Sequence, residues 1–386
     1  RQLLDEDGMM TLLHFAENSE LKTRIAEMFS GAPVNTTENR PAQHMAMRTP
    51  DHLVSDAYQK LSAFAESVRR NPEITTVVNL GIGGSDLGPQ MVTQALAGYH
   101  DGPACHFVGN ICPTDLHDVL VTCDPRKTLF IVTSKTFTTA ETLTNAMMAK
   151  RWLDRHGVDA CAAMVAVTAA CARAKEWGID PDHIFAFAND IGGRYSLWSP
   201  VGLSVMIAIG SENFSRLLAG AYAMDCHVQH ADLPQNIGVI MGLLRVWCRR
   251  YLQLPAYGLI PYDQRLAAMP AWAQQLEMES NGKSVDRKGH PLQSPAGPLL
   301  WGAAGTGAQH SFFQWLHQSV DITPIDILVA MQPAAGLNDQ AFHDNHKSLA
   351  VNAVAQAEAL ASGSPNLAEP HRHFSGNRPS VLISWD

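Results

Sequence analysis

The sequence predicts an α/β protein with two related three-layer αβα domains that contain parallel sheets, preceded by a helical segment. Strand-like apolar runs alternate with helix-like stretches from about residue 52 onward, which is typical of a parallel sheet covered by helices on both faces. The same alternation begins again after residue 253. The length of 386 residues, 46% of them hydrophobic, is sufficient for two or three domains with full cores.

Residues 1–48 form the predicted N-terminal helical and crossing segment. Residues 1–30 have helical periodicity, and the turn-rich stretch SGAPVNTTENRPAQH that follows predicts an extended crossing. The first predicted domain covers residues 49–210. Its expected strands, each preceded by a helix-like stretch, are ITTVVNLGI, CHFVGN, TLFIVTS and AAMVAVT.

The second predicted domain covers residues 211–386. After a helical stretch at 199–253, the expected order is a helix in AAMPAWAQQLEMES, a strand in GPLLWG, a helix in QHSFFQWLHQ, a strand in DILVAM and a long helix at 343–361. A further apolar run, VLISW, is strand-like. The order of strand, glycine turn and helix at 296–318 resembles that at 77–98, without a residue-level repeat.

Composition argues against several classes of protein. The chain has 28 Lys and Arg against 37 Asp and Glu and no basic block, so we expect no nucleic-acid partner. No uninterrupted apolar run approaches the roughly 20 residues of a spanning helix, so we expect no membrane segment. The seven scattered cysteines favour reduced thiols and a cytoplasmic location. The pairs His343/His346 and His371/His373 lack a third ligand at a telling spacing, so we expect no metal.

The stretch VVNLGIGGSDLGP, residues 77–89, predicts a strand that turns into a helix through four glycines. Such a turn can bring backbone N–H groups close to a phosphate. Asp86 stands where a dinucleotide fingerprint has its third glycine, and the P-loop lysine is missing, so we expect no nucleotide cofactor. A ligand loop and a tight turn that needs positive φ are both open interpretations.

The stretch VTSKTFTTAET, residues 132–142, places hydroxyl groups and one lysine between a strand and a helix. Hydroxyls and free N–H groups at a helix N-terminus, together with a lysine, favour a site for a phosphate monoester. The alternative is an ordinary capping cluster. The hydroxyl and lysine residues are Ser134, Lys135, Thr136, Thr138 and Thr139.

Three further stretches contain candidate catalytic groups. Arg194 in GGRYSLWSP is suited either to an oxyanion or to a structural carboxylate. In QQLEMESNGKS a helix is expected to end at residues 281–282, and the residues alone do not choose between Glu277 and Glu279 as a general base. Four residues before Glu279, on the same helix face, lies Gln275. His310 is expected in the first turn of a helix, where the dipole favours a neutral imidazole, with a surface histidine as the alternative.

In this order, the stretches resemble the phosphoglucose isomerases of the sugar isomerase (SIS) domain family. The resemblance covers nearly the whole chain, and GGRYS and MESNGK are signatures of that family. The other matching stretches are MFSGAPVNTTENRPAQHMAMR, NLGIGGSDLGP, SKTFTTAETLTNA, IPYDQRL, GTGAQHSFFQWLHQ, HKSLAVNAVAQAEAL and GNRP.

The resemblance implies the interconversion of glucose 6-phosphate and fructose 6-phosphate, a step of glycolysis and gluconeogenesis, through a cis-enediolate without metal or organic cofactor. It implies that Glu279 is the base that moves the proton and that Arg194 stabilises the enediolate. His310 is implied as the ring-opening residue, contributed by the neighbouring subunit of a homodimer. The implied contacts to the phosphosugar are Gly84, Ser85, Ser134, Lys135, Thr136, Thr139 and Gln275.

Some features depart from the family pattern. GTGAQH replaces the usual GTNGQH, and the chain stops at Asp386 before the family's C-terminal lysine segment. An N-terminal helical portion is also missing, so we expect a chain truncated at both ends that has little activity. Two alternatives are a sugar-phosphate-binding regulator without turnover and a dual phosphoglucose/phosphomannose isomerase. The presence of all three implied catalytic residues favours an enzyme over a regulator.

Overall fold

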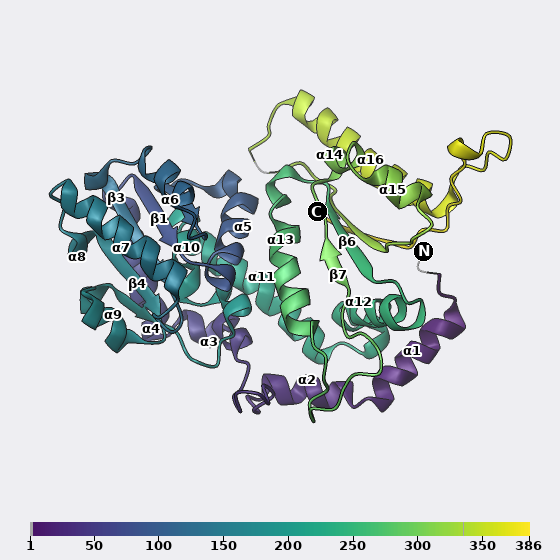
Figure 1. Cartoon of the computed structure of the whole chain (residues 1–386), viewed down its shortest axis with the longest axis horizontal. Helices are drawn as coiled ribbons and strands as arrows, with labels where there is room; N and C mark the ends of the chain where they lie inside the picture. Colours follow the sequence, from purple (N-terminus) through teal and green to yellow (C-terminus); the bar gives the residue numbers. More distant parts are fainter. Residues whose placement is uncertain (1–2, 335) are drawn as a thin grey trace. The chain divides into compact units, whose positions relative to one another are not determined.

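A computed structural model describes residues 3–334 and 336–386 (Figure 1). The chain divides into two compact units, a terminal unit of Arg1–Arg24 with His230–Asp386 and a central unit of Ile25–Gln229. Residues 1, 2 and 335, which fall within the predicted N-terminal segment and second domain, lie outside the described residues. The domain limits expected from the sequence stay a prediction.

The central unit contains a five-stranded parallel sheet in the order β2-β1-β3-β4-β5. Three of its strands are buried along their whole length, because their nearly continuous apolar runs are covered on both faces. The expected parallel sheet is confirmed. The sequence prediction lacks β5, an edge strand of three residues that is too short to show a pattern. The strands are β1 (Thr76–Leu80), β2 (Ala104–Val108), β3 (Thr128–Thr133), β4 (Met164–Thr168) and β5 (Ile184–Ala186).

Helices cover both faces of this sheet and give the expected three layers (Figure 1). On one face, Phe130 and Val132 of β3 belong to a core cluster with Ala146, Ala149 and Leu153 of α7. Elsewhere in the unit, α10 packs against α4, α5 and β2. The helices are α3 (Pro50–Leu53), α4 (Asp56–Arg70), α5 (Leu87–Ala95), α6 (Pro113–Leu120), α7 (Ala140–Arg155), α8 (Ala160–Ala163), α9 (Cys171–Trp177), α10 (Leu203–Ile209) and α11 (Ser211–His230).

The terminal unit contains a four-stranded parallel sheet in the order β7-β6-β8-β9. Successive residues of its strands face opposite sides. Ile260 and Ile327 pack with α14, α15 and α16, whereas Leu259 and Leu328 pack with residues of α13. The strands are β6 (Ala256–Pro261), β7 (Leu299–Trp301), β8 (Ile325–Ala330) and β9 (Ser380–Trp385). The helices are α1 (Glu6–Asn18), α12 (Ile237–Val246), α13 (Met269–Gln274), α14 (Gly305–Gln309), α15 (Phe313–Gln318) and α16 (Gln340–Ser362), and α2 (Leu21–Phe29) follows α1 along the chain.

Strand β6 is absent from the sequence prediction because AYGLIP contains a glycine and a proline, which weaken a strand signal. The structure explains the glycine. A Cβ at Gly258 would lie 2.7 Å from Cγ2 of Ile325 in the neighbouring strand β8. Gly258, which weakens the strand signal of this segment, is therefore the residue that lets β6 pack closely against β8.

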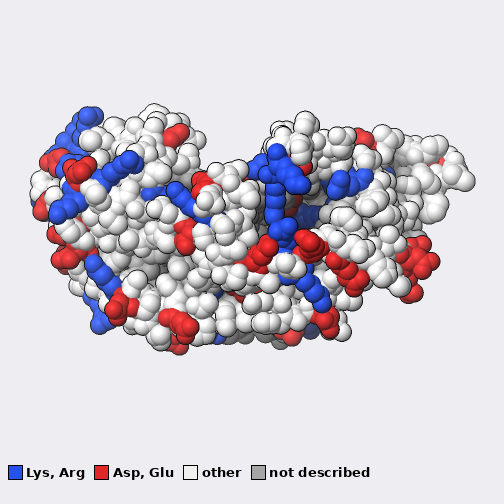
Figure 2. Space-filling model, turned by 90° about the horizontal axis from the view of Figure 1, so that it is seen from below, with Lys and Arg blue, Asp and Glu red and all other residues white. Residues whose placement is uncertain are grey.

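The surface charges, the helices and the cysteines of the described chain give little further information about function. Acidic and basic side chains are interspersed on the face that Figure 2 shows. Within the described residues, no helix is long and apolar enough to cross a membrane. The same part of the chain holds no group of three or more His, Cys, Asp and Glu that could bind a metal ion. All seven cysteines are free thiols.

Candidate functional site

In the central unit, the loops that follow β1 and β3 leave the sheet side by side. Strand β1 pairs with β2 on one side and β3 on the other, so the strand order reverses at this point. Leu80 at the end of β1 lies opposite Val132 near the end of β3. Ligands of open α/β sheets bind at such a switch point, outside the carboxyl ends of the strands. The two loops are 81–86 and 134–139, the ones that the sequence singles out.

A buried amide links β1, β3 and the glycine turn. Asn79, the last residue but one of β1, has a fully buried side chain, and its Oδ1 accepts a hydrogen bond of 3.0 Å from Thr133 Oγ1 at the end of β3. Its Nδ2 donates to the carbonyl oxygen of Ser85 at 3.1 Å. Asn79 is absent from the sequence prediction, although a polar residue inside the apolar run VVNL is a signal that could have identified it.

In the glycine turn, one glycine has a positive φ and the next packs closely against a neighbouring segment. In η2 (Gly83–Ser85), Gly83 has a φ of +59°, so the tight-turn interpretation holds for this residue. A Cβ at Gly84 would lie 2.1 Å from the carbonyl oxygen of Gly193 and 2.6 Å from the amide nitrogen of Arg194. The missing side chain therefore lets this turn contact η6 (Gly193–Trp198), the GGRYS stretch.

Arg194 lies half-buried in η6, with its guanidinium carbon 5.1 Å from the centre of the Tyr195 ring. Within η6, Ser196 Oγ donates a hydrogen bond of 2.6 Å to the carbonyl oxygen of Gly193. This bond holds the backbone against which Gly84 packs. The turn that contains Ser85 and the segment that contains Arg194 thus form one packed unit.

Asp86, directly after the glycine turn, is a buried carboxyl group that lacks a full set of partners. Its Oδ1 has no hydrogen-bond partner among the described residues. A Cβ at Gly109 would lie 2.5 Å from its Oδ2, which shows how closely the loop after β2 covers it. Burial, with a smaller contribution from the Asp115 charge, raises the pKa of Asp86 to about 7.

We expect Asp86→Asn to stabilise the protein at pH 8 more than at pH 5. The folded chain holds the Asp86 proton more tightly than the unfolded chain, so wild-type stability falls as the pH rises from about 4 to about 7 and then stays level. Asparagine removes this titration, a gain on the order of 2 to 4 kcal/mol above pH 7.

Urea unfolding of both proteins at pH 5 and pH 8 measures this effect. Asp118→Asn is the control, because the Asp118 side chain is 79% exposed. The prediction would be contradicted if the free energies of unfolding of wild type and Asp86→Asn differed by the same amount at both pH values.

The loop after β3 contains two pairs of hydroxyl groups. Ser134 Oγ lies 3.0 Å from Thr139 Oγ1, and Thr136 Oγ1 lies 2.7 Å from Thr138 Oγ1. Thr139 is the N-cap residue of α7, yet within the described chain its side chain makes no capping hydrogen bond. Simple capping therefore does not account for this cluster.

Lys135 helps to line a cavity of about 430 Å³ beside this loop. Its Nζ donates to the carbonyl oxygens of Asn189 and Ile191 at 2.8 and 2.9 Å, and burial lowers the pKa of Lys135. Arg173, which the sequence prediction does not include, also lines the cavity and donates a hydrogen bond of 2.9 Å to the carbonyl oxygen of Thr136. Two cationic side chains at one cavity favour an anionic ligand.

In the terminal unit, Gln275 and Glu279 are the first and last residues of η11 (Gln275–Glu279), a π-helical turn that continues α13. The helix runs on to residue 281, as the sequence predicts. A π turn has no sequence signal here and is often found at functional sites. Gln275 Oε1 is buried without a hydrogen-bond partner in the described part of the chain, whereas Glu279 is exposed.

The structure distinguishes the two glutamates that the residue pattern leaves open. Glu277 Oε1 accepts a hydrogen bond of 2.9 Å from Asn281 Nδ2, and its Oε2 lies 3.5 Å from a guanidinium nitrogen of Arg245. Glu277 is thus partly buried and engaged with two neighbouring side chains. Glu279, in contrast, is exposed.

The predicted position of His310 in the first turn of a helix is wrong. Helix α14 begins at Gly305 and ends at Gln309, so the exposed His310 is its C-terminal cap. The reason is a contact with Tyr262. A Cβ at Gly305 would lie 2.5 Å from the Tyr262 ring, and Gln309 Nε2 donates to the Tyr262 hydroxyl at 2.8 Å. These contacts start the helix early and leave a break before α15.

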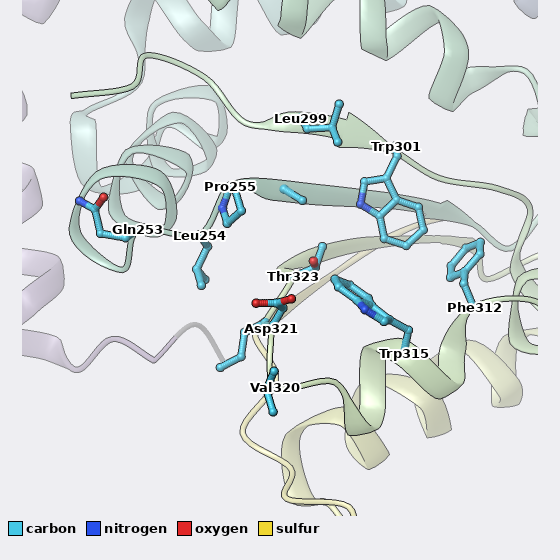
Figure 3. Close-up of a pocket in the computed structure, with 12 residues that line it drawn as sticks. Gln253, Leu254, Pro255, Leu299, Trp301, Phe312, Trp315, Val320, Asp321 and Thr323 are labelled. Atoms are coloured by element: carbon cyan, nitrogen blue, oxygen red, sulfur yellow. The ribbon is translucent and has the colours of Figure 1, made fainter.

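A second cavity, of about 640 Å³, lies in the terminal unit at the edge where β6 and β8 begin (Figure 3). Leu254, Trp301, Phe312 and Trp315 are among its mostly apolar lining residues. None of its described lining residues is a predicted site residue. The described lining residues therefore give no link between this cavity and the candidate site residues.

Solved structures of phosphosugar isomerases have this arrangement of parallel sheets covered by helices. The structure of a tagatose-6-phosphate ketose/aldose isomerase from Escherichia coli matches 89% of this chain and 83% of its own length with a TM-score of 0.55. Its sequence identity is 12%, so this likeness concerns the fold alone.

Similarity in sequence defines the family. The family model of phosphoglucose isomerase matches residues 1–385. A glucose-6-phosphate isomerase from Ruegeria sp. is 42% identical over 420 residues, which cover 99% of this chain and 78% of that relative. The crystal structure of a glucose-6-phosphate isomerase from Chlamydia trachomatis has 32% identity and a TM-score of 0.90 over 99% of this chain and 77% of its own. The chain belongs to the phosphoglucose isomerase family, which confirms the resemblance seen in its motifs.

Proposed function

We propose that this protein is an aldose–ketose isomerase that interconverts glucose 6-phosphate and fructose 6-phosphate. The match of residues 1–385 to the phosphoglucose isomerase family carries the proposal. The cavity with Lys135 and Arg173 beside the hydroxyl-rich loop supports a phosphorylated substrate. The chemistry needs no redox partner, because an aldose and its ketose are isomers.

Substrate binding is assigned mainly to the phosphate group. In this proposal the 134–139 loop holds the phosphate through Ser134, Lys135, Thr136 and Thr139. A phosphate held away from the reacting carbons supplies binding energy that orients the sugar chain. The remaining contacts to the sugar or phosphate are assigned to Gly84, Ser85 and Gln275.

The proton transfer is assigned to Glu279. In the open-chain aldose, its carboxylate takes the proton from C2, and the C–H electron pair forms the C1–C2 double bond of the enediolate. Arg194 stabilises the negative charge that develops on oxygen. Return of the proton from the Glu279 carboxyl group to C1, together with transfer of the O2 proton to O1, gives the ketose and restores the carboxylate. His310 is assigned to the opening of the sugar ring.

Loss of deuterium from C2 of labelled glucose 6-phosphate, together with formation of fructose 6-phosphate, tests the proposal directly. The Ruegeria relative serves as the reference for turnover in the same assay. Mannose 6-phosphate in parallel tests for a second epimer. Tight binding of glucose 6-phosphate without any exchange at C2 would favour a regulatory binder and contradict the proposal.

We also propose a cytoplasmic homodimer in which each subunit contributes His310 to the site of its partner. The seven free thiols suit a reducing compartment.

A mixture of two variants tests the shared site. Glu279→Gln and His310→Gln are each expected to be nearly inactive alone. Refolded together in equal amounts, they are expected to regain up to a quarter of wild-type activity, because roughly a quarter of the active sites then contain both an intact Glu279 and an intact His310. Light scattering provides the mass of the assembly. A monomer, or a mixture as inactive as its parts, would contradict this arrangement.

A further inference from the structure

We propose that Glu277 and Arg245 are positioning residues, which hold the π-helical turn η11 in the conformation that the reaction requires. The inference rests on the proposed role of Glu279, the last residue of this turn. Neither Glu277 nor Arg245 needs to touch the substrate for this role. All of the groups involved belong to the terminal unit.

Arg245, near the end of α12, is held by the core of this unit. One guanidinium nitrogen lies 3.2 Å from Oδ2 of Asp326 on β8, and the guanidinium carbon lies 4.0 Å from the centre of the Tyr257 ring on β6. The Asp326 side chain is 2% exposed, and its Oδ1 accepts a hydrogen bond of 2.8 Å from the Tyr257 hydroxyl. The arginine is thus fixed to two strands of the sheet.

From this fixed position Arg245 reaches the turn. Its other terminal nitrogen is 3.5 Å from Oε2 of Glu277, and both side chains are about one-fifth exposed, at 20% and 21%. That nitrogen is buried and has no hydrogen-bond partner in the described chain, so the Glu277 carboxylate is the negative charge that faces it. Loss of the Glu277 charge would leave the partly buried Arg245 guanidinium without a negative charge on the side that faces η11.

A second set of contacts holds the turn from the side of β7. Asn281 Nδ2 donates to Glu277 Oε1 at 2.9 Å. A Cβ at Gly297, just before β7, would lie 2.7 Å from Asn281 Cβ and 3.2 Å from Glu277 Oε1. The carbonyl oxygen of Gly297 accepts a hydrogen bond of 3.1 Å from Arg249 Nε. Glu277 is therefore held between α12 and the segment that leads into β7.

The position of Glu277 matters because Glu279 follows it by two residues within the same turn. A π turn is a rare departure from the α-helix, and tertiary contacts must maintain it. A backbone shift at Glu277 would move the Glu279 carboxylate, and a misplacement of about 1 Å can cost about 100-fold in rate. Phosphate binding is assigned mainly to the 134–139 loop of the central unit, so we expect the loss chiefly in kcat and little change in KM.

Glu277→Gln tests the inference, because glutamine keeps an acceptor for Asn281 and removes the charge that faces Arg245. We expect kcat to fall by about 10- to 100-fold and KM to stay within about twofold. The primary isotope effect with C2-deuterated substrate is expected to rise, because proton transfer becomes more strongly rate-limiting. Glu277→Asp, which keeps the charge, is expected to recover part of the rate.

Glu369→Gln is the matched control, since Glu369 pairs with Arg372 at 3.2 Å in the same unit but on the surface. It is expected to leave kcat and the isotope effect unchanged. A Glu277→Gln enzyme with wild-type kcat overturns the inference. So does a loss of kcat with an unchanged isotope effect, because partial unfolding alone would produce it.

Amide hydrogen exchange of residues 275–281 tests the positioning role without any activity. We expect exchange there to be about tenfold faster in Glu277→Gln than in the wild type, with β8 unchanged. Equal exchange in the two proteins rejects the inference. If the wild-type chain has no isomerase activity but residues 275–281 still exchange faster in Glu277→Gln, the result supports the structural role of Glu277 and rejects only the proposed function.

Discussion

Glu279→Gln is expected to lower kcat for the interconversion of glucose 6-phosphate and fructose 6-phosphate by about 10²- to 10⁴-fold, the usual contribution of a general base. Glutamine has the size of glutamate but does not accept a proton near neutral pH. Glu279 is exposed at the end of η11, so the substitution leaves the core of the terminal unit intact. The affinity for the substrate is expected to stay within about threefold, because it is assigned mainly to the phosphate group.

Steady-state kinetics and calorimetric titration with glucose 6-phosphate measure these two effects. Glu358→Gln is a suitable control, because Glu358 is an exposed residue of α16. Wild-type kcat in Glu279→Gln would show that another group moves the proton. A parallel loss of binding and turnover would instead assign Glu279 to substrate binding.

Gly84→Ala is expected to lower the free energy of unfolding by about 1 to 3 kcal/mol, the usual cost of overpacking, and to reduce kcat as well. The added Cβ would lie 2.1 Å from the Gly193 carbonyl oxygen, which is backbone and has no alternative rotamer. The glycine turn and η6 must then separate. This separation would displace Arg194, whose amide nitrogen lies 2.6 Å from the same Cβ position.

Denaturant unfolding and kinetics of Gly84→Ala are compared with those of Gly220→Ala. Gly220 lies in α11 of the same unit, and apart from its chain neighbours and the backbone of its own helix no atom of the described residues comes within 4 Å of a Cβ built there. The control is expected to be stabilised by about 0.4 to 1 kcal/mol, with unchanged kcat, because alanine suits a helix better than glycine. Equal stability of the two variants would show that the contact with η6 is not needed.

Several elements of the fold could be predicted because their signals are local. The parallel strands β1, β3 and β4 are nearly continuous apolar runs, which is what burial on both faces of a sheet requires. The loop after β3 could be identified because its hydroxyls and lysine exceed what a helix cap needs. The order of strands, by contrast, depends on pairing between distant segments and makes β1 and β3 neighbours.

Contacts over long sequence distances explain what could not be predicted. Gly258 weakens the strand signal of β6 although it is needed for packing on Ile325. The early start of α14, which moves His310 to the end of a helix, depends on the Tyr262 ring. Arg173 reaches the loop after β3 from a helix that follows β4, so its spacing along the chain contains no signal of the contact.

The sequence by itself determined the α/β class, the family and the segments that contain the candidate chemistry, because hydrophobic periodicity and motif composition act over a few residues. Only the tertiary structure decided which groups lie together. It brought the Gly84 turn against the Arg194 segment, tied Asn79 to Thr133, and engaged Glu277 with Arg245 while it left Glu279 exposed. These outcomes depend on close packing and on the partners of buried polar groups, which form only when distant segments meet.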